Sequence, residues 1–366
     1  MQELEPQPAF EAALSALPAC LLDAPIGIAV SGGSDSLALL ILAHRWASGQ
    51  GRTLLALTVD HGLRLEAREE AEAVGRLCAR LGIAHEILRL EDAPPRQSAL
   101  RRLRHGALAQ ALRERSGRLL LTGHTADDQA ETFLIRARQG SGWYGLAGMR
   151  PLSLSPVWPE GEGVFIARPL LGVRREALRD LLRSQGTGWA DDPSNENPAF
   201  ERVRMRRLLC PEVAGSVPIL SVIDRFVTLR MLEDAAIWRW MAVNVRVTPE
   251  GLEASAIASL PPERAARALG LLLQIAAGRD RPPRGEGLAR LAQALVSNEV
   301  FKGATLAGCR IRPGRGVLKL QPESGPPPPG MAARVAATLA ILSASPNEIA
   351  ASAGKESFLE ELVPIF

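Results

Sequence analysis

The sequence predicts an α/β fold, an open, doubly wound and mostly parallel sheet, followed by a mainly helical second domain. Two observations lead to this prediction. In the first third of the chain, short continuous apolar runs alternate with amphipathic stretches of helical period, which is typical of parallel strands covered by helices on both faces. From about residue 211 to residue 297 the apolar spacing is helical, with breaks at Pro261-Pro262 and at 279–287.

Each expected strand is followed by an expected helix. The strands are predicted at 26–30, 53–59, 83–90 and 118–122, and the helices at 37–46, 66–81, 98–115 and 127–138. Residues 140–168 are rich in glycine, proline and tryptophan and are expected to form loops. Because ligands of such sheets bind at the carboxyl ends of the strands, the residues that directly follow the strands are the candidate functional residues.

Three parts are expected along the chain. The first domain covers 1–210, with a core at 25–150 and a helical extension at 151–210. The second domain covers 211–321 and closes on a short β-like piece. Residues 322–366 begin with the run PESGPPPPG and are predicted to be a linker and a short tail, in which the last 36 residues form either a short helix or a disordered segment.

Composition excludes several classes of site. Of the 43 basic residues, which stand against 40 acidic ones, only Lys302, Lys319 and Lys355 are lysines. A phosphate-binding or Schiff-base lysine is therefore excluded from the first two thirds of the chain. The four cysteines form no CxxC pair and the five histidines form no HExxH motif, which argues against a zinc or iron–sulfur centre. No apolar run approaches the roughly 18 residues of a membrane span, and the first residues lack a signal-peptide pattern, so a cytoplasmic protein without membrane contact is expected.

The first expected strand runs into a glycine-rich turn. The turn consists of Ser31, Gly32, Gly33, Ser34, Asp35 and Ser36. Glycines and small hydroxyl residues at a strand-to-helix turn direct N–H groups toward one point, which suits a phosphate group. Asp35 would repel a lone anion, but its carboxylate fits there if Mg²⁺ lies between it and the phosphate oxygens. A helix-capping turn is the alternative interpretation, since Ser and Asp are favoured caps.

This turn resembles the phosphate-binding loop of the N-type ATP pyrophosphatases, which split ATP into AMP and pyrophosphate and use no lysine in the loop. Between residues 59 and 209 there follow, in order, VDHGLR, ALRRLRH, LTGHTADDQAETFLIRARQGSGWYGLAGM, ARPLLGVRREALRDLL and WADDPSNENPAFERVRMRRLL. Together these segments resemble the bacterial tRNA(Ile)-lysidine synthetase family, densely over 25–210 and more weakly in the second domain. Two positions depart from the family pattern: Arg104-His105 stands where Arg-Tyr is usual, and Arg202-Val203 where Arg-Asn is usual.

The resemblance implies a ligase that modifies the wobble cytidine of the isoleucine tRNA with a CAU anticodon. In that family the C2 carbonyl oxygen of the base attacks the α-phosphate of ATP, and the ε-amine of free L-lysine then displaces AMP to form lysidine. The change switches codon reading from AUG to AUA. Mg²⁺ is expected as a cofactor, the second domain is expected to bind the tRNA body, and no obligate protein partner is evident.

The resemblance also assigns residues near the nucleotide. Asp35 and Arg104 are expected to act close to the reacting groups, and His61, Gly123 and His124 are expected to line the ATP pocket. A structural role is the alternative for each histidine, and a solvated helix face is the alternative for Arg104.

Three acidic residues follow the fourth expected strand, namely Asp127, Asp128 and Glu131. Asp128 and Glu131 are three positions apart on one predicted helix, so both side chains can face one pocket. We expect them to bind the lysine substrate, with either one as the base that takes a proton from its amine. Asp127 is expected to help hold the metal ion. The alternative is a capping box from Thr125 to Asp128, together with acidic residues that favour a first helical turn.

Arginines and aromatic residues provide the candidate contacts to RNA. In the cluster ERVRMRR four arginines stand against one glutamate, and these arginines are expected to contact tRNA phosphates: Arg202, Arg204, Arg206 and Arg207. The arginines between 174 and 183 are also spaced for contact with a phosphate backbone. Acidic residues are interleaved with them, so a surface ion-pair face is the alternative there. Trp143, Tyr144 and Trp189 are candidates for stacking on an extruded base, with core packing as the alternative for Trp189.

Two other functions compete with this interpretation. The first is another ATP pyrophosphatase enzyme, such as a tRNA thiolase or an amide-forming synthetase, but the chain lacks the cysteine motifs that these enzymes use. The second is a non-catalytic tRNA-binding protein whose loop only senses ATP. Release of pyrophosphate that depends on both lysine and the isoleucine tRNA distinguishes the three.

Overall fold

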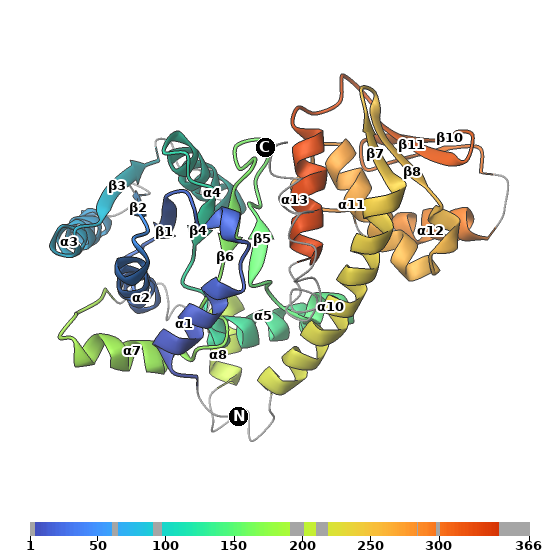
Figure 1. Cartoon of the computed structure of the whole chain (residues 1–366). Coiled ribbons are helices and arrows are strands. Elements are labelled where there is room, and N and C mark those ends of the chain that lie inside the picture. Colours follow the sequence, from blue (N-terminus) through green and yellow to red (C-terminus); the bar gives the residue numbers. More distant parts are fainter. Residues whose placement is uncertain are drawn as a thin grey trace. The chain divides into compact units, whose positions relative to one another are not determined.

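The computed structural model of this chain describes residues 4–60, 65–90, 97–190, 201–209, 219–283, 285–297 and 301–343. Contacts divide the chain into two units (Figure 1). The first unit consists of Met1–Ser155 and Val164–Arg230, and the second of Pro156–Gly163 and Met231–Phe366. Among the described residues, no helix combines the length and the hydropathy that crossing a membrane requires.

The first unit is built on a six-stranded sheet of order β3-β2-β1-β4-β6-β5. Its strands are β1 Ile26–Ala29, β2 Leu54–Asp60, β3 Ala84–Arg89, β4 Leu119–Leu121, β5 Leu152–Leu154 and β6 Phe165–Ala167. All neighbouring pairs are parallel except β5 with β6. The predicted doubly wound, mostly parallel fold is therefore confirmed. Strands β5 and β6 lie where the sequence predicts only loops. They are not predicted because each has only three residues and the surrounding sequence is rich in glycine and proline.

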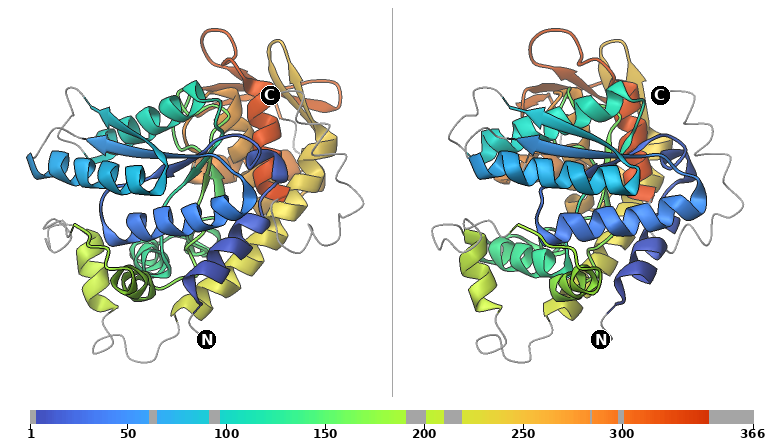
Figure 2. Two further views of the ribbon diagram at one scale, coloured as in Figure 1. Left: turned by 60° about the vertical axis from the view of Figure 1, so that its left-hand side comes forward. Right: turned by 90° about the vertical axis from the view of Figure 1, so that its left-hand side faces the viewer.

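Helices cover both faces of this sheet. They are α1 Pro6–Ser15, α2 Ser34–Gln50, α3 Leu65–Leu81, α4 Gln97–Glu114, α5 Ala126–Arg138, α6 Trp143–Leu146, α7 Arg175–Ser184 and α8 Glu201–Leu208, with a short 3₁₀ helix η1 Ala19–Leu21. Figure 2 shows α2 and α3 on one side of the sheet and α4 on the other. Alternate residues of a strand point to opposite faces of the sheet. On the face covered by α4, Leu55 and Leu57 pack with Leu112 in one buried cluster.

Helix α2 begins where β1 ends, which places the glycine-rich turn at the carboxyl edge of the sheet. The helix contains a run of buried residues from Leu37 to Ala43, so it is apolar on all sides, as expected of a helix enclosed between a sheet and other helices. It ends at Gly51, whose φ of 64° provides the left-handed conformation of a helix C-terminus. The position of the turn is thus fixed by a fully buried strand and helix.

The second unit combines helices with a five-stranded antiparallel sheet of order β7-β8-β11-β10-β9. Its elements are α10 Ile219–Asn244, which begins in the first unit, β7 Val245–Thr248, β8 Gly251–Ser255, η3 Ile257–Ser259, α11 Pro262–Ala276, α12 Glu286–Val296, β9 Ala304–Leu306, β10 Cys309–Pro313, β11 Val317–Pro322 and α13 Met331–Ser343. The helical character of this region is as predicted. The β7–β8 hairpin differs from the prediction. Residues 245–255 are predicted to be helical, but they form two strands, and burial alternates from Leu252 to Ser255 along β8.

The segment after the proline-rich run contains a helix. A short helix and a disordered tail are the two alternatives expected for the last 36 residues, and residues 331–343 form helix α13. Its residues Met331, Val335, Leu339 and Leu342 follow helical spacing and belong to the buried core of the second unit, together with residues of α11 and the sheet. Residues 344–366 lie outside the described part of the chain.

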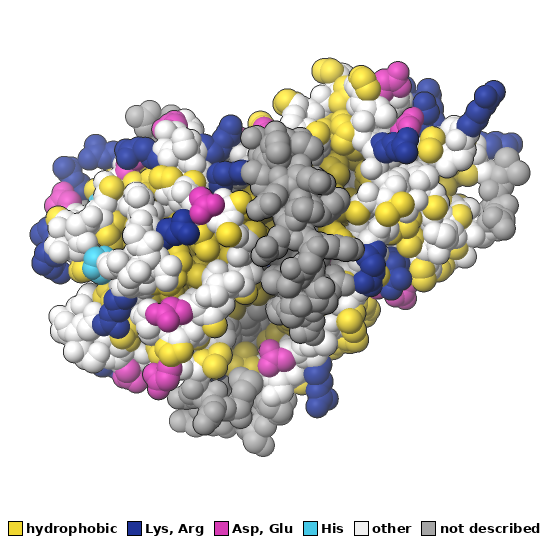
Figure 3. Space-filling view, viewed as in Figure 1, with side chains coloured by type: hydrophobic (Ala, Val, Ile, Leu, Met, Phe, Trp, Pro, Cys, Tyr) yellow, Lys and Arg dark blue, Asp and Glu magenta, His cyan; other side chains and the backbone are white. Residues whose placement is uncertain are grey.

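Charged side chains of both signs are interspersed on the visible face of the first unit, and no field of a single sign covers it (Figure 3). This distribution agrees with the small net charge of +3.

Candidate active site at the carboxyl edge of the parallel sheet

Hydrogen bonds of its own serines fix the conformation of the turn after β1. The N–H of Ser31 donates to Oγ of Ser36 at 3.1 Å, and the Ser36 hydroxyl donates to the carbonyl oxygen of Gly33 at 2.9 Å. Gly32 has a φ of 83°, which a residue with a side chain rarely adopts. Gly33 is the N-cap of α2, and no side chain caps this helix. The first N–H groups of α2 therefore remain available for an anion, which favours the phosphate interpretation over the capping one.

The turn after β4 lies against the first turn of α2. A Cβ added to Gly123 would lie 2.9 Å from the carbonyl oxygen of Asp35 and 3.2 Å from the N of Ser36. Only glycine fits such a close approach of two backbones. Gly123 thereby brings the start of α5, with its acidic residues, next to the glycine-rich turn.

Thr125 and Asp128 form a capping box at the start of α5. Both the N–H and the hydroxyl of Thr125 donate to Asp128 Oδ2 at 2.9 Å, and the N–H of Asp128 donates back to Thr125 Oγ1 at 3.4 Å. The other oxygen, Oδ1, accepts from Nη2 of Arg175 at 3.3 Å. The capping alternative is therefore correct for one oxygen of Asp128, while the other faces the site.

Arg175 is the residue on which the acidic side chains converge. Its Nε donates to Asp35 Oδ2 at 2.9 Å, its Nη2 donates to Asp128 Oδ1, and its Nη1 lies 3.8 Å from Glu131 Oε1. From the sequence, Arg175 is predicted only as one of several arginines that contact phosphates or form a surface ion-pair face, so this role is not predicted. The rule that functional residues follow strands could have identified it, since it stands eight positions after the end of β6.

Glu131 is almost completely buried, with 1% of its side chain exposed. Its Oε1 accepts from Nε of Arg206 at 2.8 Å. Its Oε2 is buried and has no hydrogen-bond partner in the described part of the chain. A buried carboxylate oxygen without a donor is costly, so this oxygen marks a place for a donor from a ligand.

Asp127 points toward the start of α7 instead. Its Oδ2 accepts from the backbone N–H of Arg175 at 2.7 Å, and its Oδ1 lies 3.4 Å from Nη2 of Arg174. Asp127 thus satisfies a free N–H group at the amino end of α7, where a negative charge also interacts favourably with the helix dipole. Its predicted role as a metal ligand is untested.

The protonation states follow from burial and from Arg175. Burial raises the pKa of Asp35, and the guanidinium of Arg175 opposes this rise only in part. Burial also disfavours ionised Asp128, but Arg175 and the hydrogen bonds from Thr125 outweigh it and lower the pKa of Asp128. The three carboxylates in turn raise the pKa of Arg175, so its guanidinium stays charged.

Two histidines lie among arginines at the same edge of the sheet. Burial, assisted by Arg168 and other arginines, lowers the pKa of both His124 and His105 to about 3. Thr122 Oγ1 is 3.0 Å from Nδ1 of His124. Neither ring nitrogen of the buried His105 has a hydrogen-bond partner among the described residues. Both imidazoles are therefore neutral near pH 7, and each offers a hydrogen-bonding ring rather than a charge to this edge of the sheet.

Desolvation and the nearby charge of Arg202 lower the pKa of Arg104, so these two predicted residues lie close to each other. Arg202 also influences His124. His61, which is predicted to line the ATP pocket, lies outside the described residues.

The four arginines predicted to bind tRNA lie on helix α8 but differ in their surroundings. Val203 and Met205 are buried, and the arginines are exposed. Arg206 enters the site through its ion pair with Glu131. Arg202 and Arg206 are four positions apart and share the face of the helix that turns toward the site, so Arg204 and Arg207 are the members of the cluster that lie off this face.

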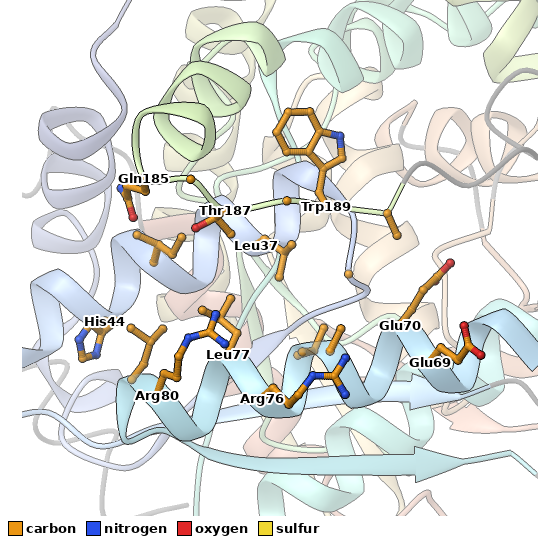
Figure 4. Close-up of a pocket in the computed structure, with 18 of the residues that line it drawn as sticks. Leu37, His44, Glu69, Glu70, Arg76, Leu77, Arg80, Gln185, Thr187 and Trp189 are labelled. Carbon is orange, nitrogen blue, oxygen red and sulfur yellow. The ribbon is translucent and has the colours of Figure 1, made fainter.

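A cavity of about 720 Å³ extends from Gly32 along the groove between α2 and α3. Figure 4 shows Thr187 and Trp189, from the segment after α7, opposite Leu37 and Leu77. The N–H of Ala190 donates to the carbonyl oxygen of Gly32 at 3.0 Å, which ties this segment to the glycine-rich turn. Trp189 lines the cavity, and the guanidinium carbons of Arg179 and Arg183 lie 6.0 and 5.7 Å from its ring centroid.

Comparisons with known proteins show the family to which this chain is similar. A family model of the PP-loop domain matches residues 7–213. The tRNA(Ile)-lysidine synthase of Hyphomonas neptunium is 75% identical over 360 residues, which covers 98% of both chains. The enzyme of the same name from Caulobacter vibrioides is 38% identical over 304 residues, 81% of this chain and 66% of that protein. Among solved structures, a U34-tRNA thiolase from Methanococcus maripaludis with a [4Fe-4S] cluster has a TM-score of 0.50 at 17% identity and covers 61% of this chain and 78% of the thiolase, a likeness of fold alone.

Proposed function

This chain belongs to the tRNA(Ile)-lysidine synthase family, and from that premise we propose how its site works. The enzyme is an ATP-using ligase that forms lysidine at the wobble cytidine of tRNA(Ile). The C2 oxygen of the cytidine attacks the α-phosphate of ATP and pyrophosphate leaves. The ε-amine of lysine then attacks C2 and AMP leaves, with loss of one proton from the amine.

The turn after β1 is the proposed site of the ATP phosphates. Its support is the uncapped amino end of α2 beside Gly32 and Gly33, where several N–H groups can donate to one phosphate. The hydroxyls of Ser31 and Ser34 add donors at the same edge. Because this loop has no lysine, backbone groups and arginines have to neutralise the departing pyrophosphate.

Asp35 is the proposed protein ligand of Mg²⁺. In proteins this ion is bound by one or two carboxylates together with substrate phosphates, and a single carboxylate directly after a phosphate loop fits that requirement. In the described ranges no group of three or more His, Cys, Asp or Glu side chains could hold a metal, so the remaining ligands would come from the nucleotide and water. When bound, the ion would offset charge on the phosphates.

The observation that carries the lysine site is the unsatisfied Oε2 of Glu131. Among the described residues, the guanidinium groups that form ion pairs with Asp35, Asp128 and Glu131 are those of Arg175 and Arg206. The three carboxylates thus have two ion-pairing cations in the described part of the chain, and Oε2 of Glu131 lacks a hydrogen-bond donor there. An ammonium group of lysine supplies a further positive charge and this donor.

Glu131 is also the better of the two candidate bases. Both oxygens of Asp128 are already engaged, by Thr125 and by Arg175, and the pKa of this carboxyl is lowered. A general base needs a free oxygen to take the proton, and a lowered pKa makes it a weaker proton acceptor. Glu131 Oε2 provides the free oxygen, so we assign the amine proton to it.

The neutral His124 and His105 are proposed to hydrogen-bond ATP or the cytosine ring, and Arg104 to act beside the reacting phosphate. Arg204 and Arg207 are proposed to contact tRNA phosphates, and the second unit to bind the tRNA body. A cytoplasmic location, where this tRNA is used, stays a prediction.

The reaction is tested by incubating the full chain with ATP, Mg²⁺, radiolabelled lysine and a purified isoleucine tRNA with a CAU anticodon. We expect label in the tRNA and equal amounts of AMP and pyrophosphate. A methionine tRNA with the same anticodon is the matched control and is expected to remain unlabelled. Pyrophosphate release that needs neither lysine nor the isoleucine tRNA would contradict the proposal.

A further inference from the structure

The guanidinium of Arg175 lies in the place where two cationic ligands are expected. It contacts Asp35, the proposed metal ligand, through Nε, and Asp128 and Glu131, the proposed lysine ligands, through its two terminal nitrogens. Of the Arg175 side chain only 17% is exposed, so these contacts are shielded from water and strong. A single arginine thus bridges the nucleotide side and the amine side of the site.

Both oxygens of Asp35 are engaged in this arrangement. Oδ2 accepts from Arg175 at 2.9 Å, and Oδ1 accepts from the Ser34 hydroxyl at 3.2 Å. Each oxygen keeps a second lone pair, so binding of a metal ion does not by itself require either hydrogen bond to break. Charge distinguishes the two contacts: a divalent cation on Asp35 repels the positive guanidinium of Arg175, whereas the neutral Ser34 hydroxyl can turn and stay beside the ion. The contact with Arg175 is therefore the one that metal binding weakens.

Arg175 is anchored through its backbone, so its side chain can move while helix α7 stays in place. Its backbone N–H is held by Asp127 Oδ2 at 2.7 Å, and Arg174 pairs with the other oxygen of Asp127. The amino end of α7 thus stays in place when the side chain rotates. Asp128 Oδ1 remains within reach of the guanidinium after its contact with Asp35 is lost.

We propose that Arg175 is a resident counter-ion of the resting enzyme, which neutralises Asp35, Asp128 and Glu131 and leaves Asp35 when the metal–nucleotide complex binds. This inference rests on the proposed metal role of Asp35. In the absence of ligands it prevents three close carboxylates from repelling one another, and it keeps stray divalent cations out of the site. Metal binding is thereby coupled to a rearrangement beside the lysine ligands.

The test measures Mn²⁺ binding to the full chain without nucleotide, by electron paramagnetic resonance. Arg175→Gln removes one positive charge from the acidic cluster, so we expect about tenfold tighter Mn²⁺ binding, a size typical of coupling between two ligands. The double variant Asp35→Asn, Arg175→Gln should return to the weak binding of the wild type. Arg183→Gln is the matched control on the same helix, because the ion pairs of Arg183 among the described residues are with the exposed Glu176 and Asp180 and not with the acidic cluster of the site. Unchanged or weaker Mn²⁺ binding by folded Arg175→Gln would overturn the proposal.

A second measurement does not require Arg175→Gln to fold. In wild-type protein with ¹⁵N-labelled arginine, the Nε–H resonance of Arg175 is assigned by its loss in Arg175→Lys. Addition of Mg²⁺ with a non-hydrolysable ATP analogue should shift this resonance, because its acceptor Asp35 is lost. A resonance that keeps its position at saturation would overturn the counter-ion role.

The two proposals fail in different ways. If Asp35→Asn binds Mn²⁺-ATP as tightly as the wild type, the metal role of Asp35 is wrong and the counter-ion proposal falls with it. If Asp35→Asn loses this binding and Arg175→Gln gains no Mn²⁺ affinity, the proposed function stands and only the counter-ion inference is wrong.

Discussion

Nε of Arg206 donates to the buried carboxylate of Glu131 at 2.8 Å, across 75 positions of the chain. This contact joins α8 to α5, two helices that pack against each other. An arginine predicted to meet tRNA phosphates is therefore also part of the proposed lysine site. The position of α8, and with it the arginine-rich surface, is coupled to the state of Glu131.

Arg206→Ala and Arg204→Ala should have different effects. Loss of Arg206 leaves Glu131 with one guanidinium fewer, so we expect the unfolding free energy to fall by about 1–3 kcal/mol and the KM for lysine to change. Arg204→Ala should leave the KM for lysine unchanged and reduce the salt slope of tRNA binding by about one. Urea unfolding, lysine titrations and tRNA titrations at several salt concentrations provide the readouts. Full stability of Arg206→Ala together with an unchanged KM for lysine would show that the ion pair with Glu131 is unimportant.

Glu131→Gln should separate the two chemical steps. The amide keeps the shape of the side chain but cannot attract an ammonium group or take its proton. We expect adenylation of the tRNA to persist while lysine transfer falls by at least about a hundredfold, since general-base groups contribute roughly 10²–10⁴ in rate. The adenylated tRNA and lysidine are measured separately in a single-turnover experiment. Normal turnover together with an unchanged KM for lysine would exclude the assigned role.

Asp35→Asn should act at the earlier step. The variant loses the negative charge that the proposed Mg²⁺ site requires, so adenylation should become undetectable at ordinary Mg²⁺ concentrations. The tRNA contacts proposed here lie on α8 and in the second unit, so tRNA binding should stay within about twofold. Gel-shift titrations and pyrophosphate release provide the two readouts. Lost tRNA binding with intact adenylation is the result that contradicts the metal role.

The sequence predicts the acidic half of this site well and its basic half poorly. Asp35 and Glu131 were identified because each follows a strand long or apolar enough to be recognised, and parallel strands end at one edge. Arg175 was missed because β6 has only three residues in a region rich in glycine and proline. The Glu131–Arg206 pair depends on how α8 packs against α5, which no local pattern contains. The β7–β8 hairpin was missed for a related reason, because its short strands gain their stability from pairing with β11 rather than from local propensity.

Acid should destabilise this enzyme partly through its buried histidines. The pKa of His105 is about 3 in the folded protein and about 6.5 when unfolded. Between these values the unfolded chain binds more protons, so stability falls as the pH is lowered from 6.5 toward 3. His105→Tyr introduces the residue usual in the family and removes this titration. From pH 6.5 to 5 the wild type should lose up to about 2 kcal/mol more than the variant, measured by urea unfolding at each pH. Parallel pH profiles of the two proteins would show that His105 does not titrate as proposed.

The close approach at Gly123 makes a sharper test of how the site is assembled. A methyl group there would meet the backbone of Asp35 at 2.9 Å, and backbone atoms cannot move aside as a side chain can. Gly123→Ala should therefore push the turn after β4 away from the first turn of α2, with a loss of about 1–3 kcal/mol in stability and a rise in the KM for ATP. Gly142→Ala is the matched control, because nothing lies within 4 Å of its added Cβ and its φ of −66° suits any residue. Stability is measured by urea unfolding and ATP affinity by titration. If Gly123→Ala behaves like Gly142→Ala in both, the two turns do not depend on this contact, and the acidic residues of α5 reach the nucleotide by some other constraint.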